Sequence, residues 1–241
     1  MNKVLCAPAF ILHRQNYRET SLILDVFSRD YGRINLIAKG VRKNRRQQFS
    51  TFELYQRHLI SWSARTELGT LTDIESDKQF ISLNQHQLFI GFYMNELIIY
   101  LLHKHEPHAE LFDYYSQALL ALASGQNEKT FLRYFEKHLL ESLGYGLVLD
   151  IDINTGEPIQ EKSHYTYEVD SGPVLYNNNN ENKLIISGKT LLQLKNESLS
   201  GEEQLREAKY LCRLIINCYL GNRKLKTREL YNAFINAGSS A

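Results

Sequence analysis

The clearest chemical feature of the sequence is a cluster of positive charge between residues 39 and 46. Its members are Lys39, Arg42, Lys43, Arg45 and Arg46, and no acidic residue lies among them. Clustered cations can neutralise the phosphates of a nucleic acid, although the same pattern also occurs in ordinary solvated loops. Because these cations have no acidic neighbours to pair with, we favour binding of a polyanion.

Aromatic residues follow this basic cluster closely. They are Phe49, Phe52, Tyr55 and Trp62. Aromatic rings beside a basic groove can stack the bases of a single strand, but several of these rings are also needed for a hydrophobic core. A second and weaker basic patch follows near the C-terminus, formed by Arg223, Lys224, Lys226 and Arg228.

The segment Ser187-Gly-Lys-Thr190 resembles the end of a phosphate-binding loop. A loop of that kind needs a glycine where this sequence has Lys183, and the intervening residues 184–186 have the character of a strand. The segment therefore predicts a helix N-cap at Ser187 or Gly188. We expect no nucleotide cofactor.

Metal and catalytic signatures are also weak. His103, His105 and His108 lack the i, i+4 spacing of helix-borne ligands, and Pro107 interrupts them. Cys212 and Cys218 are six residues apart, which predicts two small core residues on one helix. We therefore expect no metal site and no catalytic residues, which shifts the interpretation from enzyme to binding protein.

Composition sets the frame for this binding function. The chain has 241 residues, of which 43% are hydrophobic, enough for one large domain or two ordinary ones. Residues 1–80 hold 13 basic and 8 acidic side chains, a balance of +5, whereas residues 81–150 hold 4 and 8, a balance of −4. A near-neutral total thus conceals a basic N-terminal third, which favours a polyanion partner. Three cysteines and no membrane-length apolar run predict a cytoplasmic protein.

The first 80 residues predict β-structure. Short runs rich in branched and aromatic residues predict strands over residues 9–13, 21–27, 33–38, 53–62 and 67–74. The second and third of these form a hairpin around Gly32. Five strands in one short domain favour an OB-type barrel, although strand number alone leaves an SH3-like barrel open. The basic cluster then follows the third strand.

Helical spacing of apolar residues begins near residue 84. Helices are predicted over residues 84–105, 110–123, 128–143, 188–194, 201–220 and 226–235. The intervening segment is turn-rich, with one strand over residues 165–169. The fold class is therefore α+β in two parts. An OB-fold domain spans residues 1–80, and a mainly helical domain spans residues 81–241 with a turn-rich insertion at residues 147–186.

Ordered motifs along most of the chain resemble a known family. They include Leu36-Ile-Ala-Lys-Gly-Val-Arg42, Arg133-Tyr-Phe-Glu136, Leu143-Gly-Tyr-Gly146 and Lys226-Thr-Arg-Glu-Leu230. Residues 18–27, 32–33, 93–97, 110–112, 187–188 and 219–221 add to them in the family's order. Taken together, the set resembles the RecO family of bacterial DNA repair proteins, which are recombination mediators.

The resemblance implies an OB-fold that binds single- and double-stranded DNA and anneals complementary strands, including strands coated by single-strand-binding protein (SSB). It also implies partnership with RecR, a role in loading RecA, and association with the nucleoid. Carried over by position, the basic cluster and Arg33 on the preceding strand would contact phosphates. The family's helical domain also receives the acidic C-terminal tail of SSB, which ends in phenylalanine, and Arg133 is the candidate for that pocket.

One departure from the resemblance concerns zinc. Many relatives place four cysteines in the segment equivalent to residues 147–186 and bind zinc there. This sequence has no cysteine between residues 7 and 211, so a four-cysteine site is impossible. We expect a zinc-less remnant, held by Tyr165, Tyr167 and Val169 against the helices.

Two other functional classes remain open. An adaptor that works mainly through protein contacts would fit the acidic middle third, with incidental DNA affinity. A nuclease or other enzyme is the weakest alternative, and metal-dependent turnover of DNA would reveal it.

Overall fold

The computed structural model describes residues 2–43, 51–76, 81–125, 127–177 and 184–238. The chain divides into two compact units. The first unit comprises residues 1–124 together with residues 225–241, and the second comprises residues 125–224. The domain boundary predicted at residue 80 stays a prediction. The first compact unit contains the barrel, the next two helices and the C-terminal helix.

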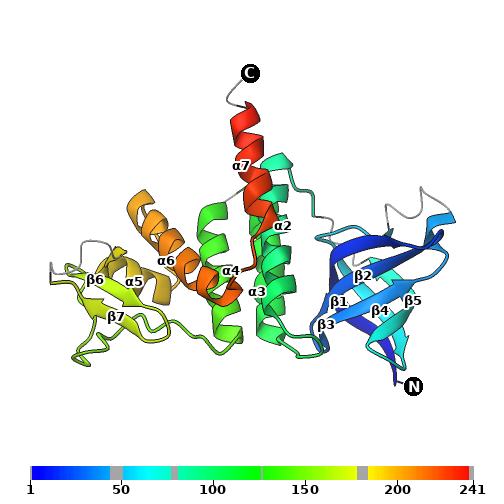
Figure 1. Cartoon of the computed structure of the whole chain (residues 1–241), viewed down its shortest axis with the longest axis horizontal. Helices are drawn as coiled ribbons and strands as arrows, with labels where there is room; N and C mark the ends of the chain where they lie inside the picture. Colours follow the sequence, from blue (N-terminus) through cyan, green and yellow to red (C-terminus); the bar gives the residue numbers. More distant parts are fainter. Residues whose placement is uncertain (1, 44–50, 77–80, 126, 178–183, 239–241) are drawn as a thin grey trace. The chain divides into compact units, whose positions relative to one another are not determined.

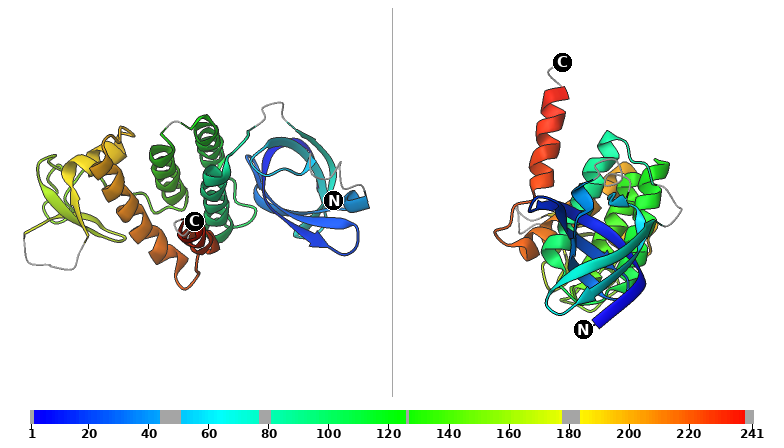
Figure 2. Two further views of the ribbon diagram at one scale, coloured as in Figure 1. Left: turned by 90° about the horizontal axis from the view of Figure 1, so that it is seen from above. Right: turned by 90° about the vertical axis from the view of Figure 1, so that its right-hand side faces the viewer.

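Five strands of the first unit close into a barrel in the order β1-β2-β3-β5-β4 (Figure 1). The strands are β1 (Asn2–Tyr17), β2 (Ser21–Ser28), β3 (Gly32–Ala38), β4 (Arg57–Ala64) and β5 (Leu68–Ser76). β3 pairs with β5 in parallel, and the other neighbours are antiparallel. Figure 2 shows the closed ring nearly end-on in its left view. The predicted OB-type barrel is confirmed.

The barrel closes because strand β1 bends and side chains alternate along the strands. β1 is longer than predicted, and it pairs with β2 along its second half and β4 along its first. Its register shifts between Val4 and Ala7 and again between Ile11 and His13, as bulges do where a sheet curves. Strand β3 alternates buried and half-buried residues throughout. The inward residues form one core, which includes Leu24, Leu36, Ile60 and Trp62 on the strands and Phe52 before β4.

Helices α2 (Gln85–Leu101) and α3 (Ala109–Ser124) share a core with the barrel. The rings of Phe10 and Phe27 on the strands pack against Phe112 and Tyr115 on α3, with centroids 5.0 to 6.3 Å apart. The side chain of Asn95 on α2 donates to a β1 carbonyl at 2.8 Å and accepts from the Tyr115 hydroxyl at 2.5 Å. The shared core explains why the first unit extends beyond residue 80.

Helix α7 (Lys226–Gly238) returns to the first unit and lies along α2. The Glu96 carboxylate on α2 accepts from the backbone N–H groups of Lys226 and Thr227 at 2.9 and 3.0 Å. A carboxylate at this position satisfies the open amides of a helix N-terminus. Phe89 on α2 packs against Tyr231 and Phe234 of α7.

The second unit combines helices with a small sheet ordered β7-β6-β8. Its elements are α4 (Glu128–Ser142), β6 (His164–Glu168), β7 (Gly172–Leu175), β8 (Ile185–Ser187), α5 (Gly188–Lys195) and α6 (Glu202–Leu220). The predicted N-cap at Ser187 is present, since its side chain accepts from Thr190 N–H. Strand β7 was not predicted from the sequence.

A buried aspartate organises the turn-rich segment of residues 147–186. Asp152 is 4% exposed, and its carboxylate accepts from the N–H groups of Asn154, Thr155 and Leu175 at 2.7 to 3.0 Å. Tyr165 is buried, as expected, and its hydroxyl accepts from the N–H of Gln160 at 2.9 Å. Within the described residues, no group of three histidine, cysteine or acidic side chains could hold a metal ion.

The prediction that both late cysteines belong to the core is wrong for one of them. Cys212 is fully buried on α6, but Cys218 is exposed. Six residues of helix rotate a side chain by about 240°, so the two positions lie on different faces. Only the face that also carries Leu211, Ile215 and Ile216 is buried.

Candidate nucleic-acid interface

The basic cluster begins where β3 ends, beside the turn that joins β1 to β2. Residues 41–43 form a 3₁₀ turn, η1 (Val41–Lys43), which is tied to the β1–β2 turn by two bonds. The Arg42 N–H donates to the Thr20 carbonyl at 2.9 Å, and its guanidinium donates to the Arg18 carbonyl at 3.0 Å. The β1–β2 turn and the 3₁₀ turn after β3 are therefore held together at one end of the barrel.

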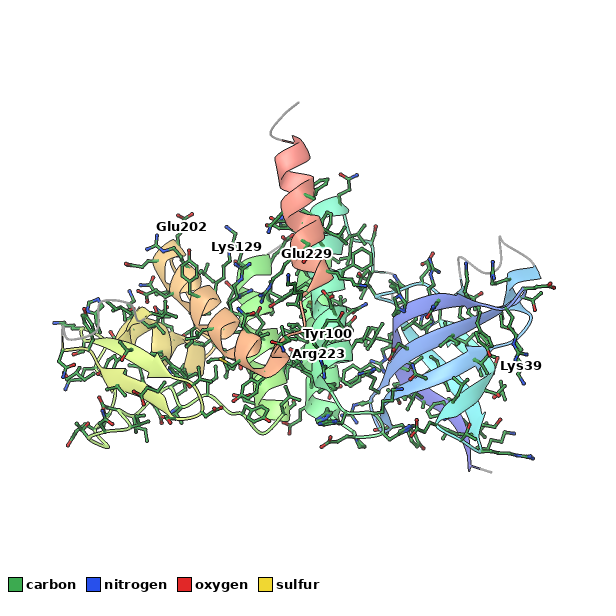
Figure 3. All side chains as sticks on the ribbon, in the orientation of Figure 1. Lys39, Tyr100, Lys129, Glu202, Arg223 and Glu229 are labelled. Carbon is green, nitrogen blue, oxygen red and sulfur yellow. The ribbon has the colours of Figure 1, made fainter. Side chains whose placement is uncertain are left out.

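An open hollow of about 520 Å³ lies at this end of the barrel. It is lined by Arg18, Glu19, Thr20, Ser21, Ile37, Lys39 and Gly40. Gly40 has a φ of +73°, and nothing lies within 4 Å of the place that a Cβ would occupy. A ligand backbone can therefore approach the main chain closely there. Figure 3 labels Lys39 beside the barrel strands.

The charge around this hollow is positive. Arg18 and Lys39 line it with two cations and Glu19 with one carboxylate, and Arg42 adds a third cation on the adjoining 3₁₀ turn. Lys39 is exposed, and Arg42 is half-buried with its guanidinium fixed by the bond to the Arg18 carbonyl. Fixed and exposed cations on neighbouring turns can hold two successive phosphates with little loss of side-chain entropy.

Sequence reasoning did not identify the contribution of Arg18 and Tyr17. The Arg18 guanidinium lies 5.3 Å from the centroid of the Tyr17 ring, in cation–π geometry. Arg18 has a φ of +51° in the β1–β2 turn, which directs the chain back into β2. The turn itself is visible in the sequence only as a polar gap between two strands, so nothing there indicated that Arg18 would meet Lys39.

The aromatic residues proposed to stack bases lie mostly in the core. Phe52, Tyr55 and Trp62 are 3%, 4% and 5% exposed, and Phe52 and Trp62 belong to the barrel core. Burial raises the pKa of the Tyr55 hydroxyl, whose ring contacts Phe92 on α2. Phe49 lies outside the described residues, as do Arg45 and Arg46 and the side chain of Lys43.

Arg33 is committed to contacts within the protein. Its side chain is 13% exposed, and its Nε donates to Asp25 at 2.9 Å. The same guanidinium donates to the carbonyls of Ile99 and Leu102 at the end of α2. Six residues of strand, about 20 Å, separate Arg33 from Lys39. The predicted phosphate contact of Arg33 stays untested, but the structure assigns its donors to anchoring α2 on the barrel.

Arg133 also lies in a buried position. It is 5% exposed on α4, and its guanidinium pairs with Glu136 at 2.9 Å. Two exposed lysines, Lys129 on α4 and Lys209 on α6, belong to the same cluster with Arg213 (Figure 3 labels Lys129). Burial and these neighbouring cations lower the pKa of Lys209. We call Lys129, Arg133, Lys209 and Arg213 the α4–α6 basic cluster.

The sequence comparisons decide the family. The family described as "Recombination protein O N terminal" matches residues 1–80, and that described as "Recombination protein O C terminal" matches residues 84–229. The chain belongs to the recombination protein O, or RecO, family. The resemblance of its ordered motifs is thereby confirmed.

Curated relatives agree with this RecO assignment. The DNA repair protein RecO of Coxiella burnetii (strain RSA 493 / Nine Mile phase I) is 43% identical over 228 residues, covering 95% of this chain and 98% of the relative. The RecO protein of Methylococcus capsulatus is 40% identical over 232 residues, covering 96% and 95%. That of Nitrosococcus oceani is 36% identical over 237 residues, covering 98% and 96%.

This RecO chain therefore has a role in DNA repair and carries an OB-type barrel at its N-terminus. Of its described helices, none is both long and apolar enough to cross a membrane.

Proposed function

We propose that this RecO protein is a non-catalytic recombination mediator that binds single- and double-stranded DNA and anneals complementary strands. It acts on strands coated by SSB and, with RecR, promotes the loading of RecA. Annealing breaks no covalent bond, so it needs charge neutralisation of two backbones rather than a catalytic constellation. We assign the protein to the cytoplasm in association with the nucleoid, where these partners are found.

The observation that supports DNA binding is the hollow at the end of the barrel that Arg18 and Lys39 line, with Arg42 bonded to the adjoining β1–β2 turn. OB-folds bind single strands at loops and on the adjoining barrel face, and a positively charged groove follows the backbone. Lys43, Arg45 and Arg46 continue the charge in sequence and belong to the same proposed site.

The test is annealing of complementary SSB-coated oligonucleotides by the full chain. The variant changes Lys39, Arg42, Lys43, Arg45 and Arg46 to alanine. We expect annealing to collapse while the thermal unfolding midpoint holds. Unchanged annealing would reject the basic cluster as the DNA site and would favour the adaptor alternative, in which protein contacts do the work.

A second proposal places the acidic tail of SSB at the α4–α6 basic cluster. Because Arg133 is paired with Glu136 inside the protein, we propose that Lys129 and Lys209 contact the tail and that Arg133 supports the site without carrying its charge. Cations beside apolar side chains suit a terminal carboxylate next to a phenylalanine ring.

Fluorescence anisotropy with a labelled SSB tail peptide tests this proposal. We expect the pair Lys129→Gln and Lys209→Gln to weaken peptide binding while annealing of bare DNA continues. The pair Lys162→Gln and Lys189→Gln removes the same charge from exposed positions elsewhere in the second unit and serves as the control. Equal peptide affinity in all three proteins would reject the site.

A further inference from the structure

Two tyrosine rings form a stacked pair in the second unit. The rings of Tyr145 and Tyr219 lie 3.8 Å apart at their centroids, with an interplanar angle of 18°. Tyr145 is 45% exposed, and one of its faces is covered by Tyr219. The exposed part of the ring therefore includes the face directed away from Tyr219. Such a pair fills no core position, since both rings reach the surface.

Hydrogen bonds fix the positions of both tyrosines. Tyr145 follows the C-terminus of α4, and its N–H donates to the Leu140 carbonyl at 3.0 Å in the manner of a Schellman motif. Gly144 takes the required left-handed conformation with a φ of +81°. Tyr219 lies in the last turn of α6, and its hydroxyl donates to the Asp170 carboxylate. The platform is thus built on two helix ends and one fixed hydroxyl.

Glycines on both sides of Tyr145 keep the exposed ring accessible. Nothing lies within 4 Å of the places that Cβ atoms would occupy at Gly144 and Gly146. Protein-docking surfaces usually surround an exposed aromatic ring with other apolar side chains. The two chain neighbours of Tyr145 are glycines and contribute no side chain. A flat ligand that approaches the ring face meets no steric barrier from these positions.

Two cations follow the platform closely in the chain. Arg223 and Lys224 are exposed and lie four and five residues after Tyr219, beyond the end of α6 at Gly221 (Figure 3 labels Arg223). The Asp170 carboxylate accepts a hydrogen bond from the Tyr219 hydroxyl and keeps its negative charge, which these two cations outnumber. Stacked aromatic surface combined with nearby cations suits a base with its adjoining phosphates, whatever the base sequence.

We propose that Tyr145 is a base-stacking platform for single-stranded nucleic acid on the second unit, with Arg223 and Lys224 receiving the adjoining phosphates. This inference extends the proposed DNA-binding function, because it gives the protein a second contact for a strand besides the barrel. Double-stranded DNA does not offer its base faces, so the platform acts on single strands alone.

The experiment measures binding of the full chain to a single-stranded oligonucleotide that contains 2-aminopurine, whose fluorescence is quenched when it stacks. Tyr145→Ala is expected to lose most of the quenching and about tenfold in single-strand affinity. Its affinity for duplex DNA is expected to stay within about twofold, because that binding uses phosphates alone. Tyr145→Phe keeps the ring and should behave as the parent protein.

Two further variants serve as controls. The first distinguishes ring stacking from a simple apolar contact, and the second tests whether removing an exposed tyrosine elsewhere has the same effect. Tyr145→Leu keeps an apolar side chain without a flat ring, so it should fail like the alanine variant. Tyr210→Ala removes a tyrosine that is 49% exposed on α6 and should have no effect. Should Tyr145→Ala unfold, the leucine and phenylalanine variants carry the comparison alone. Full quenching and unchanged affinity in Tyr145→Leu would overturn the platform.

The outcome is also distinguishable from failure of the barrel site. Loss of quenching in Tyr145→Leu, with normal binding by the variant of the five basic-cluster residues, would support the platform and reject the barrel proposal. Normal quenching in Tyr145→Leu, with lost binding in the five-residue variant, would do the reverse.

Discussion

The salt dependence of single-strand binding gives the sharpest test of the barrel site. Changing Arg18 and Lys39 to glutamine removes two cations that line the hollow and keeps most of the length of both side chains. Both side chains are exposed, so the unfolding free energy should change by less than about 0.5 kcal/mol per substitution. Binding can therefore be compared between two equally folded proteins.

The magnitude follows from counterion release. Each phosphate contact on a single strand contributes about −0.7 to the slope of log K against log salt concentration, so losing two contacts should make the slope shallower by about 1.4. At 0.1 M salt the same relation gives about fivefold in affinity for each contact and about 25-fold for two. The loss should shrink steadily as salt is raised.

The assay is fluorescence anisotropy of a labelled oligonucleotide, titrated at several salt concentrations between 50 and 400 mM, on the order of the range where such slopes are linear. The control changes Lys104 and Lys162, two exposed lysines outside the hollow, to glutamine. An equal reduction of slope in both double variants would mean that binding responds only to net charge. An unchanged slope in the Arg18 and Lys39 variant would refute the assignment of this hollow to phosphate binding.

Three further predictions concern what holds the fold together. Arg33→Met should leave the salt slope unchanged yet lower the urea-derived unfolding free energy by about 3 kcal/mol, because the half-buried Asp25 loses its ion-pair partner. A shallower slope with unchanged stability would instead make Arg33 a phosphate contact. Asp152→Ala should speed hydrogen exchange in the second unit and destabilise it by about 1–3 kcal/mol, since three N–H groups lose their acceptor; unchanged exchange at Asn154 would contradict this. Burial lowers the pKa of His58, so its contribution to stability is complete above the unfolded value of about 6.5 and is lost as pH falls below it. The midpoint temperature of thermal unfolding, measured from about pH 5 to about pH 8, should fall toward the acid end less steeply in His58→Gln than in the parent protein. Equal slopes would exclude His58 as the cause.

Most strand and helix positions were predictable because they depend on local periodicity, whereas the parallel pairing of β3 with β5 depends on barrel closure. Strand β3 alternates strictly between buried and half-buried residues, and the helix from residue 128 repeats apolar residues at helical spacing. Strand β1 was predicted too short, since Pro8 and the bulge around Leu5 interrupt the pattern that continues on both sides of them. Strand β7 contains glycine and proline, which local propensity assigns to a turn, and only its pairing with β6 makes it a strand.

The candidate site was predictable as a region but not side chain by side chain. A run of cations without acidic residues, placed after the third predicted strand, indicated that Lys39 and Arg42 lie beside the barrel, and they do. Arg33 lies on the strand that precedes the basic cluster, and its guanidinium donates to the Asp25 carboxylate and to two carbonyls at the end of α2. Partners of that kind depend on tertiary packing, which a single sequence does not display.

The return of α7 to α2 makes the second unit an insertion within the first, and this has a consequence for synthesis. The Glu96 carboxylate and the amide that it caps at Lys226 lie 130 residues apart in the chain. Closing an unstructured loop of that length costs about 4 kcal/mol plus a constant. A second unit that folds on the ribosome has already lost most of that chain entropy before α7 emerges. Folding of the inserted unit thereby becomes an early step in completing the first unit, and the face of Phe89 on α2 that packs against α7 stays uncovered until α7 docks.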